Sequence, residues 1–255
     1  MKKSWSASIV LLGLLTSFAI GQTQKSAGTS TAGKQKQSTS FADKVLKFLG
    51  ISDSPGTLKA PSKVRSGQLW VAELGTKSTR AITESAGYRS PIFIATSKDI
   101  LALKESEVWR FPVGPSQGKK LYSISSITKL VACSADDPDV VLVLQSDGSS
   151  GHPRVGLLSI STGKVTPEPY DPTSSQDLQV VENLESWDRV YGDKRVYVKR
   201  ESKQAMSGEV EWTDVFQKVN GQEPVDVSQC DGTNCGQPSM SADGRLIVFV
   251  KAEME

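Results

Sequence analysis

Residues 236–253 read GQPSMSADGRLIVFVKAE. Two β-prone runs flank a polar segment with Asp243 and Gly244, and these residue types supply the backbone conformations that reverse an antiparallel chain. The stretch therefore predicts a β-hairpin. Three earlier stretches share this organisation of two strands around a tight polar turn: SPIFIATSKDILALKE from Ser90, TKLVACSADDPDVVLVLQ from Thr128 and LESWDRVYGDKRVYVKRE from Leu184.

A second kind of unit alternates with these hairpins and consists of an apolar stretch, a linker with a turn glycine, and another β-prone stretch. Its four copies begin at Gln68, Glu107, Arg154 and Thr213. The equivalent positions Trp70, Trp109, Gly156 and Val215 are separated by 39, 47 and 59 residues. One hairpin and one such unit make four strands, which is one blade of a β-propeller. Because no helical period is sustained over ten residues from Ser66 onward, we predict an all-β propeller over residues 67–255.

The order of the strands predicts how the propeller closes. The repeats begin with the third and fourth strands of a blade, at Gln68–Thr83, and end with the first and second strands of one, at Gln237–Glu253. Joining these halves makes a composite blade, gives four blades in all, and removes open sheet edges. Ile247 and Phe249 are then expected to be buried beside the strand that contains Trp70. The competing interpretations are a two-sheet sandwich and an open fragment of a larger propeller.

The carboxy-terminal hairpin resembles the TolB-type, WD40-like propeller repeat, whose motif is P-x-x-S-x-D-G-x-x-I-x-F. The residues that carry the resemblance are Pro238, Ser241, Asp243, Gly244, Arg245, Leu246, Ile247 and Phe249. The other three copies are degenerate. TolB itself has six blades and an extra α/β domain, so the resemblance implies a fold and does not imply a partnership with Pal-type lipoproteins.

The amino-terminal region has the composition of an export signal followed by a linker. Residues 1–21 combine Lys2 and Lys3 with an apolar run and small residues, which predicts a signal peptide cleaved near Gly21. A membrane anchor is the alternative, but the run of about 12 residues is shorter than the ~20 that a span needs. We therefore expect no transmembrane span in the mature form and a periplasmic or extracellular location. Residues 22–40 contain no large apolar residue, which predicts a disordered tether.

Residues 41–66 are expected to form a short helix and a connecting loop. Ser40 is placed to cap the helix, and Phe41, Val45 and Phe48 share one apolar face before Gly50. Packing on the body of the protein is the expected role of this face. A helix that binds a partner or a membrane surface is the alternative.

Charge and motifs exclude several classes of function. The chain has 30 Lys and Arg against 28 Asp and Glu, and removal of Lys2 and Lys3 leaves 28 against 28. A neutral chain has no electrostatic footprint for nucleic acid. The only histidine is His152, and no G-x-S-x-G motif occurs, so no catalytic residue is assigned.

Neither a metal nor a cofactor is expected. The acidic turn formed by Asp136, Asp137 and Asp139 lacks the spacing of a calcium loop, and the cysteines do not form a zinc pattern. Cys230 and Cys235 lie close together in CDGTNC, which predicts a disulfide in an oxidising compartment. Cys133, in a strand pattern, is expected to be buried.

Nearly every long insertion falls between the second and third strands of a blade or between blades. Such connections emerge on one face, which we call the long-loop face. The insertions are Ser146–Pro153, Asp171–Glu182, Glu201–Glu211 and Gln229–Gly236. Long loops on a rigid scaffold commonly carry binding sites. The candidate binding residues are Tyr88 and Arg89, expected in a blade-connecting loop, together with His152, Arg154 and Lys203.

These observations favour an exported, non-catalytic propeller that binds another envelope or extracellular protein, or a glycan, through the long-loop face. The alternative is an envelope hydrolase or lyase that uses carboxylates or a metal on that face. The aromatic residues on the strands, among them Trp109 and Trp187, are expected to pack between blades rather than to form a recognition patch.

Overall fold

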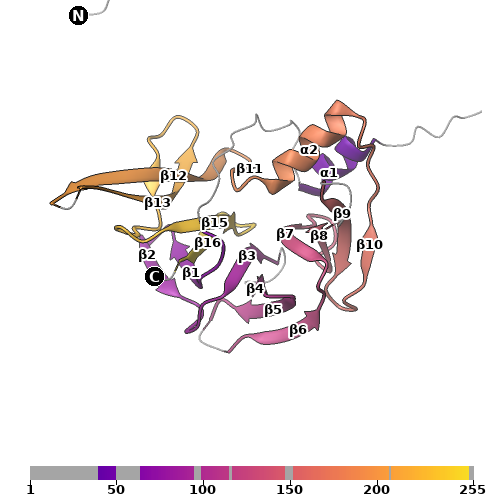
Figure 1. Ribbon diagram of the computed structural model, residues 1–255, viewed down its shortest axis with the longest axis horizontal. Helices are drawn as coiled ribbons and strands as arrows, with labels where there is room; N and C mark the ends of the chain where they lie inside the picture. The colour runs from indigo at the N-terminus through magenta and orange to yellow at the C-terminus, as the bar shows by residue number, and fades with distance from the viewer. Residues whose placement is uncertain are drawn as a thin grey trace, which may run out of the picture. The chain divides into compact units, whose positions relative to one another are not determined.

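A computed structural model describes residues 40–49, 64–94, 99–114, 117–146, 152–206 and 208–252. The predicted signal peptide, most of the tether at 22–39, the connecting loop at 50–63 and the turn at Ser97 lie outside the described residues. The described chain forms four four-stranded antiparallel sheets and two helices (Figure 1). This arrangement confirms the predicted all-β propeller of four blades.

Three blades are continuous in sequence, with strands hydrogen-bonded in chain order. Blade 1 contains β3 (Tyr88–Phe93), β4 (Asp99–Lys104), β5 (Glu107–Pro112) and β6 (Lys119–Ser123). Blade 2 contains β7 (Ile127–Cys133), β8 (Val140–Gln145), β9 (Arg154–Ser159) and β10 (Val165–Pro167). Blade 3 contains β11 (Arg189–Tyr191), β12 (Lys194–Ala205), β13 (Gly208–Val219) and β14 (Val225–Asp226).

The fourth blade is the composite blade, with the strand order β15-β16-β1-β2. Its strands are β15 (Cys235–Met240), β16 (Leu246–Lys251), β1 (Gln68–Glu73) and β2 (Ser78–Ala81). Strands β1 and β16 pair over six residues, and Phe249 lies opposite Trp70. Ile247 and Phe249 are fully buried, as predicted. The two ends of the propeller domain are therefore joined by backbone hydrogen bonds.

The second strands of the blades show why the sequence contains short continuous apolar runs. In β4, β8 and β16 the four central residues are all buried. A strand that is covered on both sheet faces reads as such a run rather than as an alternation. These strands lie between neighbouring sheets, so both of their faces contact apolar side chains.

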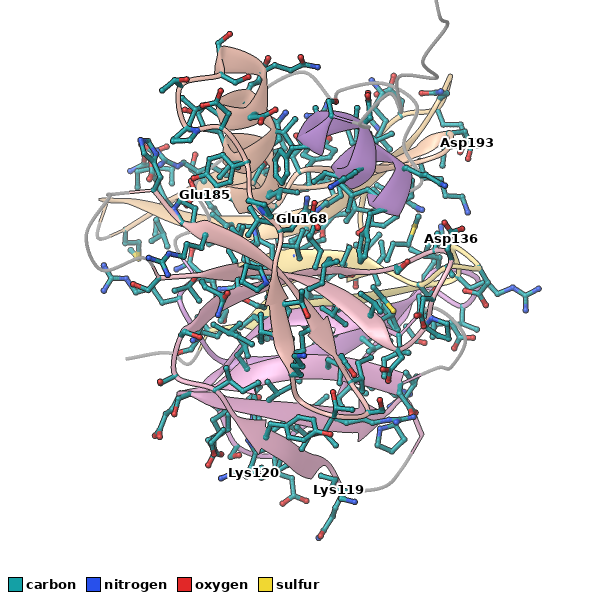
Figure 2. All side chains as sticks on the ribbon, turned by 90° about the vertical axis from the view of Figure 1, so that its right-hand side faces the viewer. Lys119, Lys120, Asp136, Glu168, Glu185 and Asp193 are labelled. Carbon is teal, nitrogen blue, oxygen red and sulfur yellow. A yellow bond between two sulfur atoms is a disulfide. The ribbon has the colours of Figure 1, made fainter. Side chains whose placement is uncertain are left out.

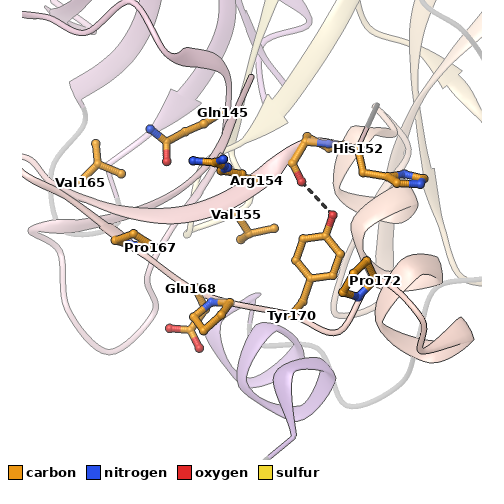
Figure 3. A pocket seen from close by; sticks show the side chains of 11 residues that line it. Gln145, His152, Arg154, Val155, Val165, Pro167, Glu168, Tyr170 and Pro172 are labelled. Carbon is orange, nitrogen blue, oxygen red and sulfur yellow. Dashed lines mark hydrogen bonds between the residues drawn. The ribbon is translucent and has the colours of Figure 1, made fainter. Parts of the chain in front are cut away.

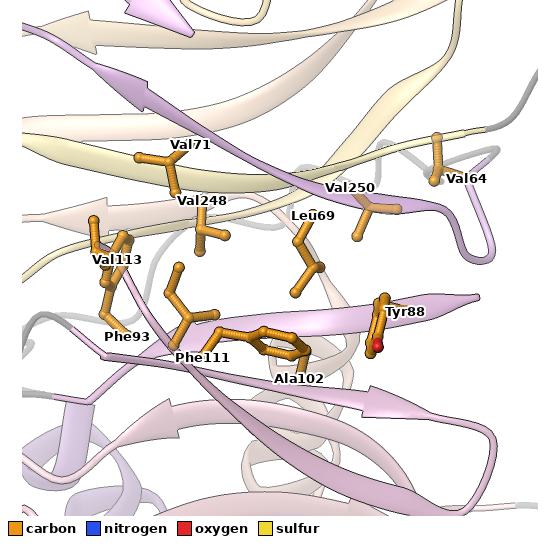
Figure 4. Packing of buried hydrophobic residues seen from close by; sticks show 11 residues of the cluster. Val64, Leu69, Val71, Tyr88, Phe93, Ala102, Phe111, Val113, Val248 and Val250 are labelled. Atoms are coloured by element: carbon orange, nitrogen blue, oxygen red, sulfur yellow. The ribbon is translucent and has the colours of Figure 1, made fainter. Parts of the chain in front are cut away.

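Apolar clusters fill the junctions between neighbouring sheets. Figure 4 shows the junction of the composite blade with blade 1, where Leu69 and Val250 of the composite blade face Tyr88 and Phe111 of blade 1. A second cluster joins blade 1 to blade 2, and another joins the composite blade to blade 3. The remaining cluster packs blade 2 against helices α1 (Phe41–Leu49) and α2 (Ser175–Glu185). The two helices therefore cover the side of blade 2 that leads toward blade 3 (Figure 1).

Helix α1 confirms the predicted cap and the predicted packing on the body. The Ser40 hydroxyl accepts a hydrogen bond from the Asp43 amide at 3.1 Å. Phe41 and Val45 are buried, and the Phe41 ring lies 5.4 Å from the ring of Tyr170. The helix therefore buries its apolar face against blade 2, helix α2 and the segment that precedes α2.

Helix α2 corrects the expectation that residues 171–182 form an open loop. It is 11 residues long, and its amino end is capped by the Ser174 side chain, which accepts from the Asp177 amide. Only Val180, Val181 and Leu184 are buried. Such a sparse apolar face gives a weak helical period, and a helix this short depends on tertiary packing.

A buried lysine and a half-buried arginine hold the carboxy-terminal end of α2, where Glu185 is labelled in Figure 2. The Lys129 ammonium of β7 donates to the carbonyls of Glu185 at 2.7 Å and Ser186 at 3.0 Å and lies 3.6 Å above the Trp187 ring. The Arg189 guanidinium donates to the Leu184 carbonyl at 3.2 Å. The last carbonyls of a helix carry partial negative charge, which offsets part of the cost of placing these cations away from water.

The expectation that the insertion Glu201–Glu211 forms a loop is also wrong. Strands β12 and β13 pair continuously from Lys194↔Val219 to Ala205↔Gly208, so most of this segment is a β-ribbon. Strand β11 pairs with β12 only up to Val196, and the ribbon extends well beyond it (Figure 1). Charged residues alternate along this segment, because neither face of the ribbon is buried deeply. The sequence therefore lacks the apolar pattern from which strands are predicted.

Deletion of Leu246–Glu255 is expected to abolish the cooperative thermal transition of the protein. The deletion removes β16, which pairs with both β15 and β1 and contributes to two core clusters. Differential scanning calorimetry measures the effect, with a variant that ends at Ala252 as the control. A deletion variant that melts like this control would show that the β1–β16 pairing does not hold the ring.

The stability contributed by Lys129 is expected to increase with pH. Burial, and secondly the positive charge of Arg189, lower the pKa of Lys129 well below its usual value, while Glu185 partly opposes the shift. Between the lowered pKa and the ordinary value of about 10.4, the unfolded chain binds more protons, so the free energy of unfolding rises with pH. Urea unfolding of the wild type and Lys129→Met from pH 7 to 10 should show this rise only in the wild type. Parallel pH profiles would contradict it.

Candidate functional site

A cavity of about 570 Å³ lies at the edge of blade 2, between the β8–β9 connection and the segment that leads from β10 to α2 (Figure 3). Its wall is mainly apolar and contains four prolines: Pro153, Pro167, Pro169 and Pro172. Tyr170 and Val155 add to this wall, while Gln145, Arg154 and Glu168 supply polar groups. We call this cavity the proline pocket.

The backbone near the pocket is shaped by its prolines. Strand β10 pairs with β9 for only three residues and ends at Pro167, a residue type that cannot donate a ladder hydrogen bond. The chain then turns across the end of β9, where the Tyr170 hydroxyl donates to the Pro153 carbonyl at 3.0 Å (Figure 3). This hydrogen bond joins the two segments that form the walls.

A glycine and an ion pair define two sides of the pocket. A Cβ atom on Gly156 would lie 2.8 Å from a methyl carbon of Val165 and 3.1 Å from the Gln145 amide oxygen, so a side chain there would collide with the wall. Glu168 accepts from the Lys44 ammonium of α1 at 2.8 Å. The pocket thus adjoins the amino-terminal helix as well as blade 2.

Two of the five candidate binding residues meet in the proline pocket. His152 and Arg154 both line it and are both exposed. Lys203 lies on the β12–β13 ribbon. Tyr88 and Arg89 lie in β3, so their expected position in a loop is wrong.

The strand position of Tyr88 and Arg89 has a physical reason. Tyr88 is only 5% exposed and packs with Phe111 in the cluster that joins blade 1 to the composite blade. The Arg89 guanidinium donates to the carbonyls of Thr128 and, at 3.0 Å, Glu105, which links blade 1 to blade 2. Burial lowers the pKa of Arg89. The arginine therefore satisfies backbone carbonyls at the blade junction.

Sequence reasoning missed Gln145, Glu168 and Tyr170 as pocket residues. The signal that could have found two of them is the run PEPYDP at residues 167–172, in which three prolines alternate with an aromatic residue and two carboxylates. Prolines at this density keep a segment extended. An extended segment beside the histidine insertion is a reasonable candidate for a pocket wall.

At least one carboxylate of the acidic turn near Asp136 has a structural role. Asp139 accepts hydrogen bonds from the hydroxyls of Ser159 and Ser161, both at 2.8 Å, and from the Ser161 amide at 2.7 Å. The two hydroxyl bonds, and then the amide bond, lower the pKa of Asp139. Among the described residues, no group of three or more His, Cys, Asp or Glu side chains is placed to hold a metal ion.

The predicted disulfide is present between Cys230 and Cys235, and both residues are buried in the cluster between the composite blade and blade 3. Cys133 is half-buried rather than fully buried, and its thiol donates to the Pro138 carbonyl at 3.6 Å. None of the helices in the described part of the chain is long and apolar enough to span a membrane.

The strand order and the composite blade define the protein as a four-bladed β-propeller. In fold it is similar to TolB from Acinetobacter baumannii, with 16% identity and a TM-score of 0.36, over 73% of this chain and 49% of that one. The chain thus spans about half the length of TolB. No family model and no curated protein matches the sequence.

Two further solved structures are similar in fold. One is the β-propeller domain of the Trilobed protease from Pyrococcus furiosus, described as having an open velcro topology, with 13% identity, a TM-score of 0.26, and coverage of 69% of this chain and 66% of that one. The other is the acylaminoacyl peptidase from Pyrococcus horikoshii, with 12% identity, a TM-score of 0.29, and coverage of 74% and 34%. These values carry no argument about activity.

Proposed function

We propose that the protein is an exported, non-catalytic propeller scaffold that binds another envelope or extracellular protein through the long-loop face. In this proposal residues 1–21 are removed near Gly21, and residues 22–40 act as a tether. The scaffold itself is the four-bladed propeller described above. The proline pocket is the anchoring point for the partner.

The observation that carries the proposal is the composition and place of the proline pocket. Its volume of about 570 Å³ lies in the range of specific binding cavities, and such cavities combine apolar walls with a few polar groups. Here the apolar wall consists of prolines and Tyr170, and Arg154 and Glu168 provide charges of both signs. Tyrosine and arginine are residue types that dominate the energetics of protein interfaces.

The proline pocket lies at the long-loop end of blade 2, as the directions of the strands require. Because neighbouring strands are antiparallel, the β8–β9 connection and the exit from β10 lie at the same end of blade 2. The short turns with Asp136 and Asp193 lie at the other end of their blades, and Figure 2 shows both of these residues on one side of the molecule. The long-loop face therefore offers a surface that the short turns do not crowd.

Arg154→Glu is expected to weaken partner capture from an envelope extract by at least about tenfold, since a reversed charge beside a binding pocket disfavours the matched partner. The matched control is Lys164→Glu, the same type of charge reversal on an exposed residue at the opposite end of β9. Both variants should keep the wild-type melting temperature. Quantitative capture with immobilised mature protein measures the effect, and equal loss in both variants would contradict a role for the proline pocket.

The enzyme alternative remains a specific competitor, because His152 and the carboxylate of Glu168 line the same cavity. Under the binding proposal, His152→Ala should change any hydrolytic or elimination rate less than twofold, since no proton transfer is assigned to it. If the protein is found to hydrolyse or eliminate a substrate, loss of a general base would reduce the rate by a factor of about 100 or more. A rate assay with His152→Ala that shows such a loss would replace the scaffold with the enzyme.

A further inference from the structure

A second cavity lies between the composite blade and blade 1, and its volume is about 750 Å³. One wall is formed by the end of β2 and the segment Ile82–Ser85 that follows it. The other wall contains Trp109 and Phe111 of β5 and the turn residues Gln117 and Gly118. We call this cavity the aromatic groove, and it is separate in its residues from the proline pocket.

Three packed aromatic rings support one wall of the aromatic groove, and of these Trp109 is half-buried while Tyr88 and Phe111 belong to the buried core. The rings of Trp109 and Phe111 are stacked, with centroids 6.2 Å apart and an angle of 17° between their planes. The Tyr88 ring meets both edge-on, with centroids 6.2 Å from Trp109 and 5.1 Å from Phe111. A Cβ atom on Gly118 would lie 2.0 Å from a ring carbon of Phe111, so a glycine is required for the ring to occupy this place.

The Tyr88 hydroxyl is the unusual feature of the aromatic groove. Tyr88 lines the groove and is 5% exposed, yet its hydroxyl forms no hydrogen bond with any described residue. The Lys104 ammonium lies 4.9 Å from the ring centroid, where it contacts the ring face. Buried polar groups in native proteins nearly always have partners, so an unpaired phenol in a cavity wall points to a ligand or a water that completes it.

The wall opposite the rings is held in place by hydrogen bonds. The Gln68 amide donates to the Glu84 carbonyl at 2.8 Å, and the Thr83 hydroxyl accepts from the Leu69 amide at 3.0 Å. Arg80 is the only cation and Glu84 the only anion among the lining residues, and the Arg80 guanidinium donates to the Val113 carbonyl. The groove therefore combines a hydrogen-bonded polar wall with lining side chains whose formal charges cancel.

We propose that the aromatic groove binds a neutral oligosaccharide. A pyranose ring has apolar C–H faces and hydroxyl edges, which match the half-buried Trp109 ring on one wall and amide, hydroxyl and carboxylate groups on the other. A sugar hydroxyl provides the hydrogen-bond partner that the Tyr88 hydroxyl lacks among the described residues. The balanced lining charges disfavour a strongly charged ligand, and the volume suits a short oligosaccharide. This site does not depend on the proposed protein partner.

The test is calorimetric titration of the mature protein with neutral disaccharides to tetrasaccharides built from hexose or N-acetylhexosamine units. At least one series is expected to bind with a dissociation constant of about 1 mM or tighter. Tyr88→Phe should weaken that binding about tenfold and leave the melting temperature equal or higher, because it removes a buried hydroxyl without a partner. The matched control is Tyr170→Phe in the proline pocket, which should leave sugar binding unchanged.

A second variant separates binding from folding. Glu84 is exposed, so Glu84→Gln should keep the fold while weakening sugar binding. The proposal is overturned if no oligosaccharide of the panel binds at 10 mM (on the order of a few kcal/mol of binding free energy), or if Tyr88→Phe binds as tightly as the wild type. Binding of an extended peptide that protects tryptophan fluorescence from quenching in the wild type but not in Trp109→Phe, with no sugar doing so, would overturn it in favour of a peptide groove.

Discussion

The pairing of β1 with β16 is the constraint on which the other contacts depend. It joins Gln68 to Lys251 in one antiparallel ladder, so residues from both ends of the propeller domain form a single sheet. Strand β16 then has one face toward blade 1, through Val248 and Val250, and the other toward blade 3, through Ile247 and Phe249. Two of the four apolar clusters thus require this one pairing. Since it also covers strand edges that would otherwise stay open, the pairing limits aggregation as well as holding the ring together.

The junction after blade 2 follows a different principle, because helices α1 and α2 provide its apolar cover. Lys129 and Arg189 add hydrogen bonds to the last carbonyls of α2, at the cost of burying one cation and half-burying the other. Helix α1 also reaches the proline pocket, since it contacts Tyr170 through Phe41 and Glu168 through Lys44. A ligand in that pocket would therefore touch residues that also position the amino-terminal helix.

The fold could be predicted from the sequence where strands are buried on both faces. It could be predicted less well where tertiary contacts determine the secondary structure. Continuous apolar runs and acidic turns were enough for the four blades and the composite blade, and the closeness of the two cysteines in the sequence was enough for the Cys230–Cys235 disulfide. Helix α2 was missed because three buried residues give no clear period, and the β12–β13 ribbon was missed because it buries little. Of the candidate site, His152 and Arg154 followed from their insertion, whereas the opposing wall depends on how β10 ends.

The repeat motif itself explains why insertions gather on the long-loop face. In the composite blade the Ser241 hydroxyl donates to the Asp243 carboxylate at 2.6 Å and accepts from the Leu246 amide at 3.0 Å, so the turn between the first two strands is fixed by its own side chains. In blade 2, Asp139 similarly ties the β7–β8 turn to Ser161 of the β9–β10 turn. An insertion at this end would break such bonds. At the opposite end, connections need only join strand ends, and a longer flexible loop adds little entropic cost, about 0.6 kcal/mol for each doubling of its length. Binding residues can therefore vary there while the turn motif keeps each blade in register.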